Sequence, residues 1–274
     1  MNIKLVTSLV VLVLFSVYGN SQTISKLNQN GYYANFTPDG ENIVFSSSSF
    51  KGLKIMDLTS TKVEVLNNEV GSGYNPVITD TKVFFSTREN KQQVTELDLD
   101  TKSTNVFNHS SKLAVCNQGL GKKTSNLPVD AKSSNDLSSV EIIYANGISN
   151  QINIEKDKNK VWVSLSPDRT KILYTVVGQK TFITDLKGNV LASLERAEAP
   201  KWANNNTIVY MLTSEDIDYI TNGEIFTFSI NTKKSTSLTG EFNDIALYPA
   251  MSVDESKVVF NNDKGELFLI NLTK

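Results

Sequence analysis

The sequence predicts an all-β fold, a six-bladed β-propeller of four-stranded antiparallel blades. A motif of strand, turn, strand, loop and strand lies at residues 33–58 and returns in weaker copies along the chain. Period-2 runs between regular turn signals favour a propeller, because each repeat is one whole four-stranded sheet. An aromatic residue marks the second strand of each clear copy, and such blades recur at about 40–50 residues. These markers are Phe45, Phe85, Tyr174, Tyr210 and Phe260.

Blade 1, at residues 33–66, shows the motif most clearly. Its first strand ends at Phe36, and Pro38-Asp39-Gly40 turns the chain into the second strand. Proline presets φ, aspartate accepts hydrogen bonds from nearby backbone amides, and glycine tolerates positive φ. The next strands are expected at 42–46, 54–58 and 62–66.

Four further copies repeat this order of signals. In blade 2, Val77 corresponds to Phe36 and Asp80 lies in the turn, whereas blade 4 has the fuller turn Ser166-Pro167-Asp168. The expected bounds of these blades are 74–107, 161–194, 199–238 and 245–272.

A sixth blade is hidden in the long interval between Phe85 and Tyr174, which is about twice the usual repeat. We place it at 112–155, with its third strand at 140–144 and its fourth at 151–155. Its first two strands are poorly marked. They are assigned to 113–116 and 127–129, and the polar stretch 131–139 is expected to be a surface loop.

The ring is expected to close through the N-terminal strand. Residues 23–28 read as a fourth strand without a blade, and the last blade ends with a third strand at 266–272. Pairing the two completes six blades and covers a sheet edge that would otherwise template aggregation.

Residues 1–21 read as a signal peptide. Lys4 supplies the positive start, residues 5–18 are mostly apolar but short for a membrane span, and Gly19-Asn20-Ser21 suits a cleavage site. We expect an exported protein, periplasmic or extracellular, whose mature domain spans 22–274 and has no stable membrane insertion. An uncleaved anchor is the alternative, and no cysteine follows the apolar run to carry a bacterial lipid.

Composition excludes several classes of partner and site. The 274 residues are 39% hydrophobic with a formal net charge of −2, so neither nucleic acid nor an anionic membrane is an expected partner. The single cysteine, Cys116, allows no intrachain disulfide and is read as a small buried hydrophobic residue. We expect no cofactor, and a monomer.

The repeats resemble the TolB-type (WD40-like) β-propeller repeat, whose core reads Pro-Ala-Trp-Ser-Pro-Asp-Gly and then Ile-Ala-Phe. The resemblance covers about residues 23–274 and is more specific for fold than for function. It departs in blades 2 and 5, where the turn is one residue shorter, and most in blade 3. The matching segments are Phe36-Thr-Pro38-Asp39-Gly40 with Ile43-Val-Phe45, Leu165-Ser-Pro167-Asp168 with Ile172-Leu-Tyr174, Pro200-Lys-Trp202, and Ile225-Phe-Thr-Phe-Ser.

This resemblance implies an exported or envelope binding protein. The family's namesake carries an additional N-terminal α/β domain, for which this chain is expected to have no room. Its partner-binding role is therefore not transferred.

The candidate binding residues are aromatic. Tyr33, Tyr74, Trp162 and Tyr248 each stand three residues before a buried first-strand position, where blade 5 has Ala199. First strands line the channel of a propeller, so these side chains are expected at one channel mouth, where aromatic groups with polar tips suit a peptide or sugar. Packing between blades at the rim is the alternative reading.

Other chemistry-bearing residues have structural readings. Asp39, Asp168 and Asp254 are expected to accept turn hydrogen bonds rather than to form a carboxylate ring. The acidic loop 216–224 lacks the ligand spacing of an EF-hand and reads as solvated. His109, the only histidine, cannot build a histidine-rich metal site, and no G-x-S-x-G elbow is present.

The sequence therefore favours a non-enzymatic binding or scaffolding propeller of the cell envelope, with an envelope or extracellular protein as partner. The rival is a secreted enzyme that processes carbohydrate or peptide with carboxylates at the channel mouth. A structural protein that holds partners on its loops is the third possibility.

Overall fold

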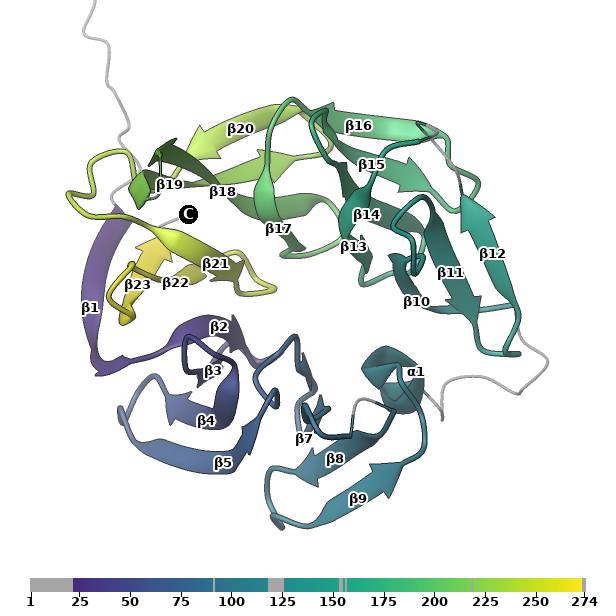
Figure 1. The fold of residues 1–274 in the computed structure, drawn as a ribbon. Coiled ribbons are helices and arrows are strands. Elements are labelled where there is room, and N and C mark those ends of the chain that lie inside the picture. Colours follow the sequence, from purple (N-terminus) through teal and green to yellow (C-terminus); the bar gives the residue numbers. More distant parts are fainter. Residues whose placement is uncertain are drawn as a thin grey trace, which may run out of the picture.

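The computed structural model describes residues 22–90, 92–117, 126–152, 155, 157–217 and 219–272. Their strands form six antiparallel sheets arranged in a ring, which is the predicted six-bladed propeller (Figure 1). Five sheets have four strands and one has three, and a single short helix is present in the described part of the chain. Residues 1–21, read as a signal peptide, lie outside the described residues.

Four blades follow the chain in order from the innermost to the outermost strand. Blade 1 is β2 (Tyr32–Phe36), β3 (Asn42–Ser46), β4 (Lys51–Asp57) and β5 (Val63–Val70). Blade 2 is β6 (Val77–Ile78), β7 (Lys82–Phe85), β8 (Val94–Asp98) and β9 (Thr104–Phe107). Blade 4 is β13 (Lys160–Leu165), β14 (Lys171–Val176), β15 (Thr181–Asp185) and β16 (Val190–Leu194). Blade 5 is β17 (Glu198–Trp202), β18 (Thr207–Asp216), β19 (Tyr219–Ser229) and β20 (Lys234–Ser237).

Blade 6 closes the ring as predicted. It consists of β21 (Leu247–Met251), β22 (Lys257–Asn261) and β23 (Glu266–Leu272), with β1 (Gln22–Asn30) as its outer strand. β1 runs antiparallel to β23 in a register that pairs Ile24 with Ile270. The N-terminal strand thus covers the edge of the last blade, beside the strand nearest the C-terminus (Figure 1).

Blade 3 departs from the predicted pattern at its inner strand. Its sheet holds β10 (Pro128–Ser133), β11 (Val140–Tyr144) and β12 (Ser149–Ile152), which match the second, third and fourth strands of the other blades. The backbone bond from Ala145 N to Leu127 O repeats the bond from Leu58 N to Glu41 O in blade 1 and fixes this alignment.

The strand expected at 113–116 is instead the helix α1 (Lys112–Cys116), which packs against β6, β7 and β10. The expected surface loop at 131–139 is also wrong in its first part, because Ala131–Ser133 belong to β10. Cys116 is partly buried beside Phe84, Val94 and Val115.

The turns between first and second strands have the predicted chemistry. Asp39 Oδ1 accepts hydrogen bonds from Thr37 Oγ1 at 2.6 Å and from Glu41 N at 2.9 Å, and Gly40 has a φ of 72°. Asp168 and Asp254 accept equivalent bonds within their own turns. These carboxylates are therefore turn acceptors rather than a ring of acidic groups.

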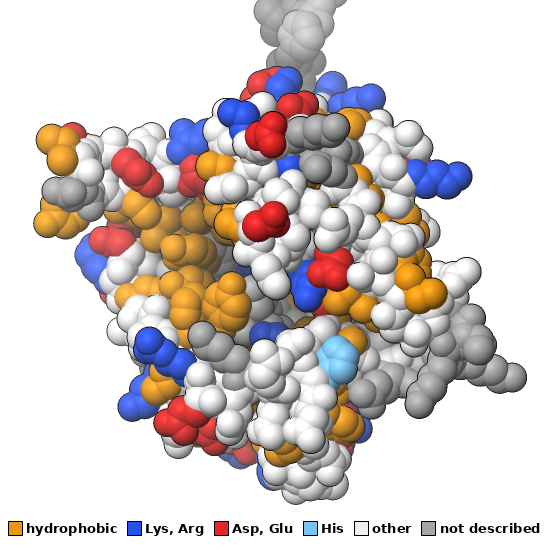
Figure 2. All heavy atoms as spheres, turned by 45° about the vertical axis from the view of Figure 1, so that its right-hand side comes forward, with side chains coloured by type: hydrophobic (Ala, Val, Ile, Leu, Met, Phe, Trp, Pro, Cys, Tyr) orange, Lys and Arg blue, Asp and Glu red, His pale blue; other side chains and the backbone are white. Residues whose placement is uncertain are grey.

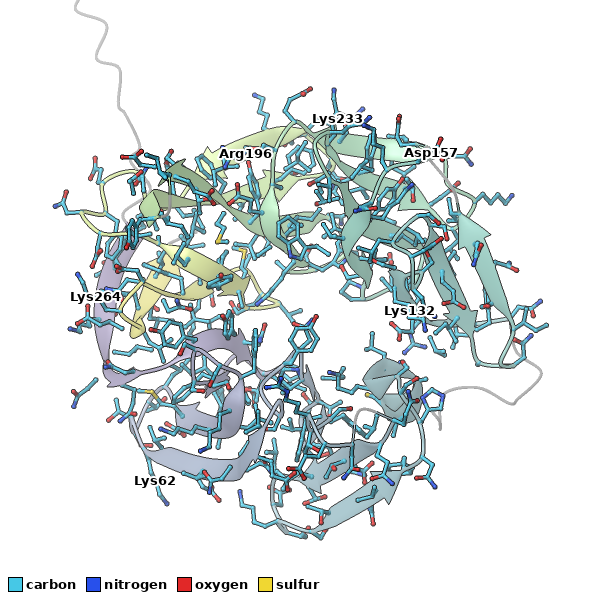
Figure 3. The ribbon with its side chains drawn as sticks, viewed as in Figure 1. Lys62, Lys132, Asp157, Arg196, Lys233 and Lys264 are labelled. Atoms are coloured by element: carbon cyan, nitrogen blue, oxygen red, sulfur yellow. The ribbon has the colours of Figure 1, made fainter. Side chains whose placement is uncertain are left out.

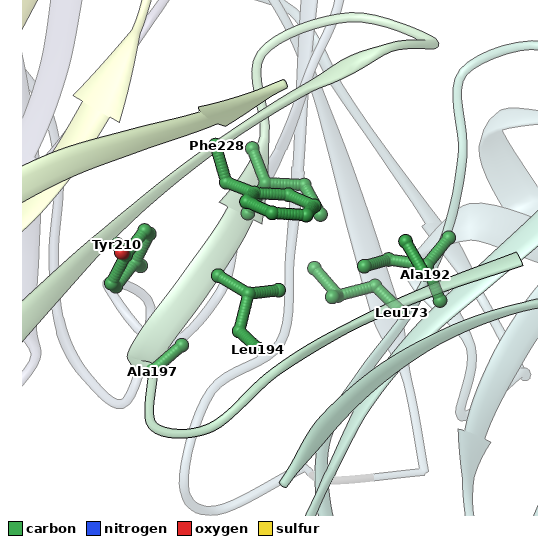
Figure 4. Close-up of a cluster of buried hydrophobic side chains, with 8 residues drawn as sticks. Leu173, Ala192, Leu194, Ala197, Tyr210 and Phe228 are labelled. Carbon is green, nitrogen blue, oxygen red and sulfur yellow. The ribbon is translucent and has the colours of Figure 1, made fainter. Parts of the chain in front are cut away.

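The hydrophobic core lies between the blades. Each sheet packs one face on the preceding blade and the other on the next, so buried clusters draw residues from two blades. In the cluster of Figure 4, Leu173 and Leu194 of blade 4 face Tyr210 and Phe228 of blade 5. Every predicted second-strand aromatic is at most 4% exposed.

Candidate functional site

The first strands share a backbone irregularity at one end of the ring, here called the aromatic end. In five blades a residue at the start of the first strand has a positive φ, and in four of these strands the pairing register shifts at that residue. A bulge of this kind re-aims a side chain away from the pleat. The residues are Tyr33 (57°), Asn75 (45°), Trp162 (52°), Ala199 (44°) and Tyr248 (52°).

Blade 2 holds an asparagine at this position because its first strand is shifted by one residue from the predicted alignment. Ile78 pairs with Val83 as Phe36 pairs with Ile43, so Ile78 and not Val77 corresponds to Phe36. Tyr74 therefore precedes the bulge position. It lies at the same end of the ring and is 56% exposed.

Three of the four predicted aromatic residues come together there. The rings of Tyr33 and Tyr248 have centroids 4.7 Å apart at 62°. Phe50, in the loop between β3 and β4, stacks on Tyr33 at 4.3 Å and meets Tyr74 edge-on at 5.2 Å. We call Tyr33, Phe50, Tyr74 and Tyr248 the aromatic cluster.

Trp162 is not part of this cluster. It is 45% exposed on β13 of blade 4, and no ring contact among the described residues includes it. The structure therefore places all four predicted residues at the aromatic end but groups only those of blades 1, 2 and 6.

Phe50 was missed because it ends the polar run Ser46–Ser49, which reads as an ordinary loop. A lone phenylalanine after four serines was the available signal. Its φ of 58° brings the side chain out of the hairpin, and its carbonyl accepts hydrogen bonds from Gly71 N and Gly73 N at the entrance to blade 2.

A positive charge borders the cluster. Lys112, the first residue of α1, donates from Nζ to the Tyr74 carbonyl at 2.7 Å, with Nζ 5.6 Å from the centroid of the Tyr74 ring. Burial lowers the pKa of Lys112 to about 8, against the opposing effect of the nearby Asp130 carboxylate. Burial in turn raises the pKa of Asp130, which accepts a hydrogen bond from Ser111 Oγ at the N-cap of α1.

The tyrosine hydroxyls are part of the electrostatics of the site. Burial, followed by the neighbouring Tyr248, raises the pKa of Tyr33. The Tyr33 hydroxyl donates to Ser48 O at 3.4 Å, and the Tyr33 N–H donates to Asn261 Oδ1 at 3.3 Å. Tyr33 is therefore a neutral phenol at physiological pH.

A second lysine lies nearer the axis of the ring. Lys201 is on β17, the innermost strand of blade 5, and donates from Nζ to Asn35 Oδ1 of blade 1 at 2.9 Å. Figure 3 shows side chains that reach from the innermost strands into the middle of the ring. Burial lowers the pKa of Lys201 to about 8. This residue was not identified from the sequence, because an isolated lysine in a short strand has no distinguishing pattern.

The remaining predicted candidates have no catalytic geometry. His109 is exposed and lines an open hollow of about 810 Å³ with polar residues of blade 2, including Arg88 and Gln93. The described residues contain no group of three His, Cys, Asp or Glu side chains suited to a metal ion. The expected loop at 216–224 is wrong for most of its length, because residues 219–224 belong to β19. β18 and β19 form a long hairpin, and Ile217 in its turn is 97% exposed. No helix in the described ranges is long and apolar enough to cross a membrane.

The space-filling view shows one face of the molecule. Hydrophobic side chains gather beside a hollow on the face shown, with Lys or Arg and Asp or Glu side chains close by (Figure 2). An apolar surface rimmed by polar groups is typical of an interaction site.

Comparisons with known proteins give similarity in structure and none in sequence. No protein-family profile and no curated protein sequence matches the chain. Among solved structures, an oligogalacturonate lyase from Vibrio parahaemolyticus has a TM-score of 0.57 at 10% identity, over 92% of this chain and 94% of that chain.

A chain in the structure of the mitotic checkpoint complex has a TM-score of 0.57 at 12% identity, over 100% of this chain and 98% of that chain. TolB from Acinetobacter baumannii has a TM-score of 0.47 at 18% identity, over 79% of this chain and 54% of that chain. In all, 1133 solved chains match, so the likeness identifies a widely used architecture and not an activity. The chain is a six-bladed β-propeller, and an oligogalacturonate lyase is among the solved structures similar to it in fold.

Proposed function

We propose that the protein is an exported, non-enzymatic binding propeller of the cell envelope, built from TolB-type repeats, and that it holds a segment of a partner protein against the aromatic cluster. The observation that carries the proposal is the contact chain Tyr248–Tyr33–Phe50–Tyr74, which ends in an exposed ring. Aromatic side chains supply a large contact area at little cost in conformational entropy, and they are enriched where partners bind.

The backbone conformation at these positions does not by itself require an aromatic residue. Ala199 and Asn75 adopt the same positive φ as Tyr33 and Tyr248, so the bulge itself needs no aromatic side chain. A bulky residue in this region costs about 1–2 kcal/mol. The choice of tyrosine therefore follows from what the rings contact.

Tyr74 gives the sharpest test, because its side chain is exposed and its loss leaves the blade cores intact. Purified wild type and Tyr74→Ala are used to capture proteins from envelope extract, and captured partners are then purified and titrated. We expect Tyr74→Ala to weaken binding at least tenfold with an unchanged melting temperature. Tyr219→Ala, 78% exposed on the hairpin of blade 5, is the matched control.

If the rings serve only inter-blade packing, the half-buried members Tyr33 and Tyr248 should matter for stability and not for binding. Loss of stability without loss of binding in Tyr33→Ala and Tyr248→Ala would contradict the proposal. Export is tested separately, because the mature protein should begin near Gln22, and an intact Met1 on the exported form would contradict cleavage.

A secreted enzyme is the second candidate, because an oligogalacturonate lyase shares the fold. Turnover of an oligogalacturonate, polysaccharide or peptide panel that one Asp or Glu substitution abolishes would replace the binding proposal. Buried acidic groups such as Asp130 are the first to substitute.

A further inference from the structure

Lys201 reaches across the front of a whole blade. It lies on β17 of blade 5, and its acceptor Asn35 lies on β2 of blade 1, so blade 6 stands between them. Ala250 occupies the register position of Lys201 on β21 of blade 6, since Ala250 pairs with Val259 as Lys201 pairs with Val209. The small side chain of Ala250 leaves room for the lysine to pass in front of that strand.

The ammonium group of Lys201 is poorly satisfied by the described residues. An ammonium has three donors, and Asn35 Oδ1 is the one acceptor that the described side chains and backbone supply to it. No carboxylate among the described residues forms an ion pair with Lys201. Its side chain is nevertheless partly exposed, so a ligand can reach it.

Lys160 shows how the same chain satisfies a structural ammonium. It is fully buried, and its Nζ donates to the carbonyls of Ser138, Glu155 and Lys158 at 2.6, 2.6 and 2.9 Å. Lys201 has one neutral acceptor instead of three. Because Lys201 is also partly exposed, its two remaining donors are open to acceptors on a bound molecule.

The orientation of Asn35 links this charge to the aromatic cluster. Asn35 Nδ2 donates to the carbonyl of Tyr33 at 3.0 Å, which turns Oδ1 toward Lys201. The side chain of Asn35 therefore links the ammonium group of Lys201 to the backbone of Tyr33, a member of the aromatic cluster.

We propose that Lys201 binds a carboxylate of the peptide segment that lies on the aromatic cluster, a proposal that rests on the proposed function. A single ammonium suits a carboxylate, whereas a phosphate favours an arginine fork or several converging N–H donors. The four rings suit apolar peptide side chains next to the acidic residue. A sugar would instead require many hydrogen-bonding side chains, and the Tyr33 hydroxyl is already bonded to Ser48 O.

The test uses peptides selected on the full-length mature protein. A phage library of random 12-residue peptides is panned on the wild type, and the enriched peptide is synthesised in two forms, with Asp or Glu and with the matching amide. Fluorescence anisotropy then compares both peptides on the wild type, Lys201→Met and Lys62→Met. Lys62 is the matched control because it is an exposed lysine at the outer edge of blade 1 (Figure 3).

We expect the amide peptide to bind the wild type and Lys62→Met at least about tenfold more weakly than the acidic peptide. On Lys201→Met the two peptides should bind alike. Asn35→Asp provides a second variant that keeps the lysine. An internal carboxylate there should occupy Lys201 and abolish the preference for the acidic peptide.

Selected peptides that bind the cluster with no acidic preference, or with the same preference on Lys201→Met, would overturn this inference and leave the proposed function standing. Failure to select any peptide, together with Lys201-dependent binding of digalacturonate, would overturn both.

Discussion

Closure of the ring by β1 makes a quantitative prediction for a cross-link between the two ends of the chain. Thr23 and Asn271 are paired in register and both are exposed, so cysteines at these positions face each other without disturbing the core. Paired antiparallel residues have Cα separations of about 4.5–5.5 Å, which a disulfide can span. The pair Thr23→Cys and Asn271→Cys is made with Cys116→Ala, so that only the intended thiols are present.

The expected gain follows from loop entropy. The cross-link closes a loop of about 250 residues, which in the chain-entropy treatment destabilises the unfolded state by about 5.5 kcal/mol. A control disulfide between Thr227 and Thr236, paired on β19 and β20, closes a loop of about 10 residues and gives about 2.7 kcal/mol. We therefore expect the ring-closing cross-link to stabilise the protein by about 3 kcal/mol more than the hairpin cross-link.

Urea unfolding of the oxidised and reduced forms measures both gains, and gel mobility without reductant shows whether the bond is intramolecular. Failure to form the bond within one chain, or a gain no larger than that of the hairpin control, would refute closure by β1. Deletion of 22–30 gives the reciprocal test. It uncovers β23 and removes Ile24 and Leu27 from two inter-blade clusters. An equally stable monomer would be inconsistent with the closed ring.

Three further predictions concern single side chains. Phe45→Ala removes a ring that is 1% exposed between blades 6 and 1 and should cost about 3–5 kcal/mol in urea unfolding, whereas Val65→Ala, at a site 51% exposed, should cost under about 0.5 kcal/mol. The Ser252 and Ser256 hydrogen bonds lower the pKa of Asp254 to about 2, so its contribution to stability is present above pH 4 and lost as the pH falls toward 2. Asp254→Asn should therefore flatten this part of the dependence of stability on pH, as measured by urea unfolding. Burial lowers the pKa of Lys201 to about 8, so between pH 8 and 10.5 the unfolded chain binds more protons than the folded one and stability rises with pH. Lys201→Met should remove this rise and be more stable than the wild type at pH 7 by up to about 3 kcal/mol. A variant that is less stable at pH 7 would contradict the unfavourable burial of the ammonium group.

The sequence was informative wherever a blade repeats its turn chemistry. Pro38-Asp39-Gly40 and the aromatic at Phe45 mark two strands and the turn between them, because local hydrogen bonds and inter-blade packing both require these residue types. The same logic located β11 and β12 of blade 3 from their alternation and hairpin spacing. It also placed three of the aromatic residues that meet at one end of the ring.

Blade 3 shows where such reasoning fails. Lys132 pairs with Glu141 at the position where Phe45 pairs with Lys54, so the aromatic marker is replaced by a charged residue. Asp130 likewise holds the position of Ile43 and contacts the helix α1 through Ser111. A helix in place of a first strand is a tertiary solution, and no repeat pattern encodes it.

Phe50 and Lys201 were missed for a different reason, since each has a partner in another blade. Phe50 meets Tyr74 across a blade boundary, and Lys201 finds Asn35 two blades away. Contacts at such sequence separation follow from topology, and single-sequence patterns carry no information about them.

The two ends of the ring differ in how their charged groups are satisfied, and this difference supports the proposed site. At the end that carries the Asp39 and Asp254 turns, each carboxylate is satisfied within its own loop. Bulky residues adopt left-handed backbone conformations at both ends, including Arg169 and Glu255 in the Asp turns, so this strain does not distinguish the ends. The difference is Lys201, which has no counter-charge among the described residues. An unpaired charge breaks a local rule and is a candidate point of contact for a ligand. Ala199 occupies the same bulge without an aromatic ring, so Ala199→Tyr adds a ring in blade 5. If the aromatic end is the binding surface, this variant should alter the affinity for the selected peptide. An unchanged affinity would confine the site to blades 1, 2 and 6.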